Sequence, residues 1–107
     1  MSPIPELQQR QIDRWCERRV PADKRIVSRW RGRMVTLVEK RPEWSVEPGE
    51  RPFAQLRYGV DGMWTLYYWS EELGRWRKYP DSVRENSPVP LLADIDRSTY
   101  GEYFFTG

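Results

Sequence analysis

Arginine and aromatic residues alternate through the middle of this 107-residue chain, and both kinds of side chain can recognise a partner. Arg57 lies in Ala-Gln-Leu-Arg-Tyr, Tyr67 and Trp69 lie in Trp-Thr-Leu-Tyr-Tyr-Trp, and Arg77 lies in Arg-Trp-Arg-Lys. The guanidinium of arginine binds carboxylates and phosphates through paired hydrogen bonds, and it also stacks on rings. Aromatic rings stack on nucleic-acid bases and are common at the energetic centres of protein interfaces. These residue types therefore predict binding chemistry.

Residues suited to catalysis or metal binding are scarce. Histidine is absent, which removes the commonest general base and the commonest metal ligand. Cys16 is the only cysteine, so it has no disulfide partner, and we expect it to pack in the core beside Ile12. Asp94 and Asp96 are two residues apart in a predicted helix, where such positions do not face each other. We therefore expect no metal, no cofactor and no catalytic residues.

The elements that carry these residues can be read from periodicity and turn residues. Ile12, Trp15 and Cys16 are spaced as on one face of a helix over 3–19, which Pro21 should end. Ser87 and Pro88 are suited to the start of a short C-terminal helix. Strands are predicted by β-favouring runs separated by short turns, which favours antiparallel pairing, at residues 26–31, 34–40, 53–58, 63–69 and 75–79. The fold class is therefore α+β: an N-terminal helix, an antiparallel sheet of about five strands and a short C-terminal helix.

Two segments lie outside these elements. Residues 42–52 contain three prolines and are predicted to be a long loop. Residues 100–107 are aromatic and short, and they are expected to dock as a tail or as an edge strand. The length of the chain is typical of a single domain, 1–107. It has no apolar run near 18 residues and no signal peptide, so we expect a cytoplasmic protein that does not enter a membrane.

Side-chain alternation predicts two different sheet faces. Ala54, Leu56 and Tyr58 read as a core face of the third strand. The opposite, outer face is predicted to gather arginine, glutamine and aromatic side chains, namely Arg29, Gln55, Arg57, Tyr67, Trp69 and Arg77. Such a surface suits a protein partner or single-stranded nucleic acid. Alternatively, the same side chains form cross-strand pairs that only stabilise the sheet.

Several motifs follow one another in a specific order. They are Cys16-Glu17-Arg18-Arg19-Val20-Pro21, the run from Val35 to Trp44, Ala54 to Tyr58, Trp64 to Trp69, Gly74-Arg75-Trp76, Leu91 to Asp96, and Gly101 to Phe104. In these motifs the chain resembles a bacterial family catalogued as domain of unknown function 3024. The resemblance covers nearly the whole chain and implies a complete, free-standing protein. It transfers no catalytic residues.

Within the resemblance, the Arg41-Pro42-Glu43-Trp44 segment is a further candidate site. Trp44 beside Arg41 and Glu39 would shape a pocket, or it would pin the long loop to the core. We therefore expect a non-enzymatic binding module that uses the outer sheet face and the 41–52 loop. The net charge of +2 favours a protein partner over single-stranded nucleic acid. A homodimer formed through a sheet edge or the C-terminal aromatic residues is the third alternative.

Overall fold

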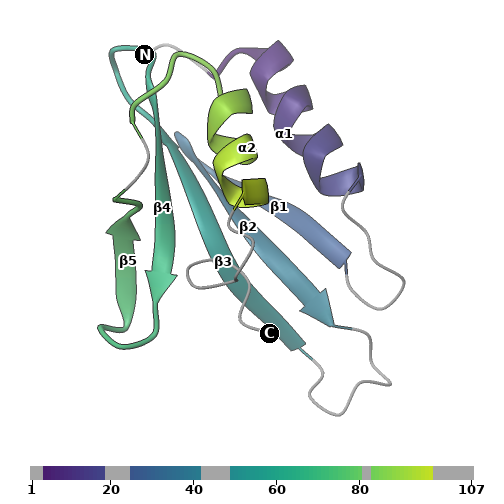
Figure 1. The fold of residues 1–107 in the computed structure, drawn as a ribbon. Coiled ribbons are helices and arrows are strands. Elements are labelled where there is room, and N and C mark those ends of the chain that lie inside the picture. The colour runs from purple at the N-terminus through teal and green to yellow at the C-terminus, as the bar shows by residue number, and fades with distance from the viewer. Residues whose placement is uncertain (1–3, 19–24, 42–48, 81–82, 98–107) are drawn as a thin grey trace.

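The computed structural model describes residues 4–18, 25–41, 49–80 and 83–97. Its elements follow the order α1 (Glu6–Arg18), β1 (Arg25–Arg31), β2 (Met34–Arg41), β3 (Gly49–Tyr58), β4 (Trp64–Ser70), β5 (Arg75–Lys78) and α2 (Val89–Arg97). The strands form one sheet in which each pairs antiparallel with its neighbours along the chain. Figure 1 shows α1 and α2 on the same face of this sheet. The predicted α+β class, with two helices flanking a five-stranded antiparallel sheet, is confirmed.

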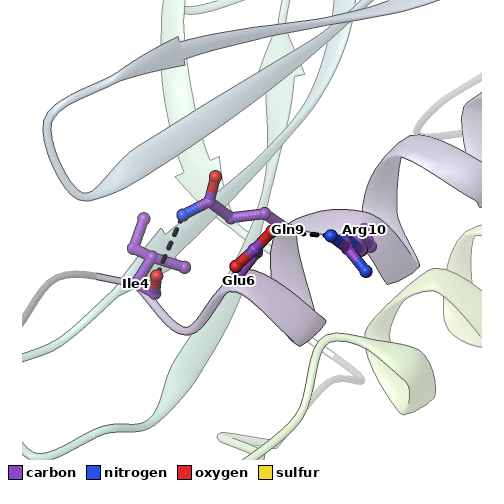
Figure 2. Close-up of polar contacts among 4 residues, drawn as sticks. All are labelled: Ile4, Glu6, Gln9 and Arg10. Carbon is purple, nitrogen blue, oxygen red and sulfur yellow. Dashed lines mark hydrogen bonds and ion pairs between the residues drawn. The ribbon is translucent and has the colours of Figure 1, made fainter.

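The first turn of α1 is stabilised by contacts between residues that are close in sequence. The Gln9 side chain reaches back to donate a hydrogen bond to the Ile4 carbonyl at 2.9 Å (Figure 2). One turn later the Arg10 guanidinium lies 2.7 Å from the Glu6 carboxylate, the i, i+4 pair that supports a helix. Glu6 also lies in the first turn, where the helix dipole favours an anion. These contacts stabilise the N-terminal turn of α1, and the buried residues of the helix follow from Ile12 onward.

The core lies between the helices and one face of the sheet. Ile12, Trp15 and Cys16 of α1 are buried, as their spacing predicted. The same cluster contains side chains from β2, β3, β4 and α2, including the fully buried Val35, Leu37, Leu56, Trp64, Leu66, Leu91 and Ile95. Each buried aliphatic or aromatic side chain of this size contributes about 1.5–3 kcal/mol relative to exposure. This apolar layer holds both helices on one side of the sheet.

Polar side chains join the layers at the margins of the core. The Trp64 indole donates to the Gln8 amide oxygen at 2.8 Å, and Ser28 donates to the Asp13 carboxylate at 2.7 Å. The Trp15 indole donates to the two carboxylate oxygens of Asp96 at 3.2 and 3.3 Å. The first bond joins α1 to β4, the second joins it to β1, and the third joins it to α2. Together they fix the orientation of α1 on the sheet.

The start of β3 differs from the predicted loop over 42–52, because residues 49–52 belong to the strand. Pro52 is tolerated in β3 because the pairing with β4 begins only at Ala54, so no partner strand on that side needs its missing N–H. On the other side, Val38 pairs with Pro52 while Leu37 pairs with Ala54, which leaves Phe53 as the extra residue of a β-bulge. Without the bulge, alternation along β3 would place Phe53 on the same face as Gln55, but Phe53 packs in the core and is 1% exposed.

Turns and caps follow the predicted residue types. Gly32 and Gly74 adopt φ of 58° and 65°, the left-handed region that glycine enters without strain, in the turns before β2 and β5. The Ser87 hydroxyl accepts a hydrogen bond from the Val89 N–H at 3.2 Å, and the Leu92 N–H bonds the Pro88 carbonyl. Ser87 therefore caps the first turn of α2, as predicted, while Pro88 directly precedes Val89, the first residue of the helix.

Some predicted features lie outside the described residues. These are Trp44 with residues 42–48 of the loop, and the aromatic segment over 100–107. Of the helices in the described part of the chain, none has the length and apolar character needed to cross a membrane.

The burial pattern of α1 makes a direct prediction about stability. Ile12 is 0% exposed and Leu7 is 69% exposed, although both lie on the same helix. Ile12→Ala should lower the free energy of unfolding by about 2–5 kcal/mol, because it leaves a cavity under the sheet. Leu7→Ala is the control and should change it by less than about 0.5 kcal/mol. Urea unfolding followed by circular dichroism measures both values, and similar losses would contradict the position of α1.

Candidate functional site

The face of the sheet opposite the helices is the candidate site. Paired residues in an antiparallel sheet point to the same face, so the register assigns each strand residue to one side. Neither helix covers this side, which we call the outer face (Figure 1). Its described side chains are Val27, Arg29, Arg31, Met34, Thr36, Val38, Lys40, Glu50, Pro52, Gln55, Arg57, Thr65, Tyr67, Trp69, Trp76 and Lys78.

One cross-strand row crosses the entire outer face. Arg29 pairs with Thr36, Thr36 with Gln55, Gln55 with Tyr67, and Tyr67 with Lys78. Four interstrand spacings of about 4.8 Å each make this row about 19 Å long. A cation therefore stands at each end of a polar and aromatic strip, and the strip runs across the strands instead of along them.

A hydrogen-bonded network fixes the middle of the outer face. The Gln55 amide nitrogen donates to the Thr36 hydroxyl at 3.1 Å, and Arg57 Nε donates to the Gln55 amide oxygen at 2.6 Å. Gln55 is only 4% exposed, so these bonds satisfy an amide that has left water. The Arg57 guanidinium carbon lies 3.9 Å from the centre of the Tyr67 ring, within the range of a cation–π contact. Gln55 thus holds Arg57 against the ring.

A second aromatic pair lies beside this network, on β4 and β5. Trp69 and Trp76 are paired across the two strands, with ring centres 5.4 Å apart and planes at 74°. Edge-to-face geometry of this kind is favourable for aromatic rings and leaves ring surface available on the tryptophans. Both side chains are partly exposed. The outer face therefore presents two aromatic groups, Tyr67 with Arg57 and Trp69 with Trp76.

The other half of the outer face contains an open groove of about 780 Å³ over β1, β2 and β3. Its lining includes the charged residues Arg29, Arg31 and Glu50. Glu50 forms an ion pair with Arg29 and lies 3.9 Å from the Lys40 ammonium. Arg31 is exposed and forms no ion pair with any residue that the structure describes. The groove therefore has positive charge in excess of its carboxylate.

The outer face is much more basic than the chain as a whole. Among its described side chains, a single carboxylate, Glu50, stands against five cations: Arg29, Arg31, Lys40, Arg57 and Lys78. The net charge of the whole chain is only +2, since most acidic residues lie elsewhere. Glu39, for example, pairs with Ile26 on the helix side, is 3% exposed, and lies 3.6 Å from Arg51. A modest net charge therefore conceals a strongly asymmetric distribution.

The register brings five of the predicted site residues together and separates one. Arg29, Gln55, Arg57, Tyr67 and Trp69 share the outer face. Arg77 does not, because it pairs with Tyr68, whose side chain packs against the core. The assignment of Arg77 to the outer face was wrong, and its neighbours Trp76 and Lys78 take that side. Alternation along β5 already separated Trp76 and Lys78 from Arg77, but which of the two sets lies on the outer face depends on the β4–β5 register.

Of the other residues that the sequence singled out, those that the structure describes do not join this outer-face cluster. Arg41 is the last residue of β2 and pairs with Gly49, and Trp44 lies outside the described residues. Asp96 accepts the Trp15 indole bond between the helices, which is a structural role. Cys16 is buried beside Ile12 in the core, as expected. Within the described ranges, no cluster of acidic and cysteine side chains is suited to holding a metal ion.

Comparison with known protein families finds one match. Residues 1–105 match the family described as domain of unknown function (DUF3024). No curated protein and no solved structure matches the chain. The family supplies no activity and no site residues, so the function must be argued from the side chains of this chain.

If the hydrogen bonds of Gln55 are formed, removing them should lower stability more than a substitution elsewhere on the outer face. Gln55→Leu removes the partners of the Thr36 hydroxyl and Arg57 Nε, so the free energy of unfolding should fall by about 1–3 kcal/mol. Thr65→Val, on the same face but without a side-chain hydrogen bond to the described residues, should change it by less than about 0.5 kcal/mol. Chemical denaturation measures both, and an unchanged stability in Gln55→Leu would show that the network is not formed.

The buried thiol makes a prediction about alkaline pH. Burial, aided by the carboxylates of Asp13 and Glu17, raises the pKa of Cys16 from 9.0 to about 12. The unfolded chain therefore loses the thiol proton first, and stability should fall as pH rises from 9.0 towards about 12, with no such effect below 9.0. Cys16→Ala should show a shallower alkaline loss. Urea unfolding at one pH on each side of 9.0 tests this, and parallel pH dependences in the two proteins would contradict it.

Proposed function

We propose that this chain, which belongs to the DUF3024 family, is a binding module that takes an anionic partner on its outer face. The observation that carries the proposal is the segregation of charge. Five described cations gather on one sheet face with one carboxylate, although the chain as a whole is nearly balanced. A face of one charge sign raises the local concentration of oppositely charged ligands and speeds their association.

The geometry of the groove supports binding more than catalysis. Its carboxylate, Glu50, forms ion pairs with Arg29 and Lys40. It would have to break both pairs before it could act as a general base. The groove is open and lies on a sheet face, whereas catalytic sites usually enclose their substrate in a cleft. Arginine forks on such a surface are suited to carboxylate or phosphate oxygens.

The low net charge favoured a protein partner, but a protein that binds through an apolar patch receives less support. Large exposed hydrophobic side chains of the described residues lie away from the outer face, at Leu7 and Val89 on the helices and at Val60, Leu73 and Val83 in turns and loops. They are scattered, whereas an apolar interface requires a contiguous patch. An acidic protein surface remains compatible with the anionic partner proposed here.

A homodimer formed by adding β5 to β5 is also less favoured. β5 has only four residues, and three of them are the basic Arg75, Arg77 and Lys78. Short, positively charged edge strands oppose pairing with a copy of themselves. The charge that disfavours self-association at this edge is compatible with an anionic partner on the adjoining face.

The proposal predicts opposite effects from two substitutions in the groove. Glu50→Gln should strengthen binding of inorganic polyphosphate about two- to fivefold, because it removes one repulsive charge and frees Arg29. Arg31→Glu should weaken binding and reduce the slope of log affinity against log salt by about 1 or more. Isothermal titration calorimetry at several salt concentrations measures both changes.

Matched controls on α1 make the same changes in net charge on the helix side. These are Glu17→Gln and Arg14→Glu, whose parent residues are both exposed. They should leave affinity within about twofold, since their charges lie across the sheet and are screened. Equal effects at the two sets of positions would mean attraction by net charge alone. A wild-type protein that does not bind polyphosphate at low salt would refute the proposal.

A further inference from the structure

We infer that the anionic partner of the outer face is single-stranded nucleic acid, with its phosphates over β1–β3 and its bases stacked on the aromatic groups of β4 and β5. This inference rests on the proposed function, because it identifies the chemistry of the same partner. Its basis is the division of the outer face into a cationic half and an aromatic half.

The two halves lie side by side on one surface. Arg29, Arg31 and Lys40 extend from β1 and β2, while Trp69 and Trp76 extend from β4 and β5. Arg57 on β3 belongs to both halves, since its guanidinium lies over Tyr67 at the boundary. A sheet about 19 Å wide, from four spacings of about 4.8 Å, brings charge and ring surface within the reach of one short oligonucleotide. Proteins that bind single strands combine these same two elements.

A partner that carries only negative charge would not need the exposed aromatic rings of the outer face. Polyphosphate or an acidic peptide is held by cations alone, whereas every nucleic-acid base has a π-face that stacks on an aromatic ring. Tyr67, Trp69 and Trp76 are partly exposed, although large aromatic side chains are commonly placed in a core. Their position beside five cations is therefore better matched by a ligand that carries both phosphates and rings.

The spacing of the aromatic groups favours a single strand over a duplex. Tyr67 and Trp69 are two residues apart on β4, which separates them by about 6.6–6.8 Å along the strand. Stacked nucleotides rise by about 3.4 Å, so bases on these two groups would be unstacked from each other. In a duplex the base faces are covered by their neighbours and reach a protein ring only after flipping out. A single strand offers its base faces without that cost.

Gln55 acts as a positioning residue in this arrangement. Its amide oxygen accepts the Arg57 Nε–H at 2.6 Å and its amide nitrogen donates to Thr36, so both ends of the amide are engaged. Arg57 is thereby kept against Tyr67 and presents a planar cation on which a base can also stack. The remaining guanidinium N–H groups of Arg57 are suited to a phosphate.

The test compares four fluorescent or competing probes at low and moderate salt by anisotropy. They are an oligothymidylate of eight nucleotides, an abasic oligonucleotide of the same length, a duplex of the same length, and inorganic polyphosphate. The oligothymidylate should bind at least tenfold more tightly than the abasic strand and the duplex, because only it offers free base faces. All charged probes should weaken as salt increases.

Two pairs of variants separate stacking from folding. Trp76→Leu and Tyr67→Leu remove the π-face but keep an apolar side chain, and each should weaken oligothymidylate binding roughly 5- to 150-fold, the measured range for a lost stack. Trp76→Phe and Tyr67→Phe keep a ring and should bind within about threefold of wild type. Circular dichroism verifies that every variant is folded, and abasic binding should be the same in all four.

The outcomes distinguish this inference from the proposed function. If polyphosphate and the abasic strand bind as tightly as oligothymidylate, and the leucine variants bind normally, the face is a general anion site and the nucleic-acid inference is overturned. Equal or tighter binding of the duplex overturns the single-strand assignment. If no probe binds at low salt, both the inference and the proposed function fall. Base-dependent binding that the leucine variants lose supports both.

Discussion

Packing of both helices against the same face of the sheet is the constraint on which the rest of the structure depends. Since α1 and α2 bury their apolar faces there, the central strands β2, β3 and β4 send alternate side chains into the core and away from it. The core side receives Leu37, Leu56 and Leu66, which are fully buried. The opposite side is released from the need for apolar side chains, and it gathers the cations and partly exposed rings of the candidate site.

The outer face is nevertheless more ordered than a solvated surface needs to be. Gln55 is buried there and bonded at both ends of its amide, and Val38 in the groove is 4% exposed. The β-bulge at Phe53 contributes to this order, because it turns an additional aromatic side chain into the core while Val38 and Pro52 remain paired. Because the network already holds Arg57 on Tyr67, this side chain would lose less conformational entropy when a ligand binds beside it.

Charge distribution carries more information about this protein than its net charge. A value of +2 argues against a strong field when it is spread over a surface. The sheet register instead concentrates cations such as Arg31 and Lys78 on one face, while acids such as Glu39 and Asp96 serve contacts on the helix side. The expectation of a protein partner over nucleic acid rested on the net charge of the whole chain, which does not describe the charge on the outer face.

By itself, the sequence determined the elements and the class of fold. The spacing of Ile12, Trp15 and Cys16, the turn glycines and the capping Ser87 are local signals, because each depends on residues only a few positions away. It also placed Gln55 with Arg57 on one face of β3, and Tyr67 with Trp69 on one face of β4, since alternation along one strand needs no partner to be read.

Only the tertiary structure decided which residues of different strands share a face. Arg77 was assigned to the wrong side because the turn that pairs Ser70 with Arg75 sets the β4–β5 register, and a shift of one residue exchanges the two faces of a strand. The bulge moved Phe53 into the core for the same reason. The charge segregation of the outer face is a sum over five strands, so it depends on pairings between residues that are distant in the chain.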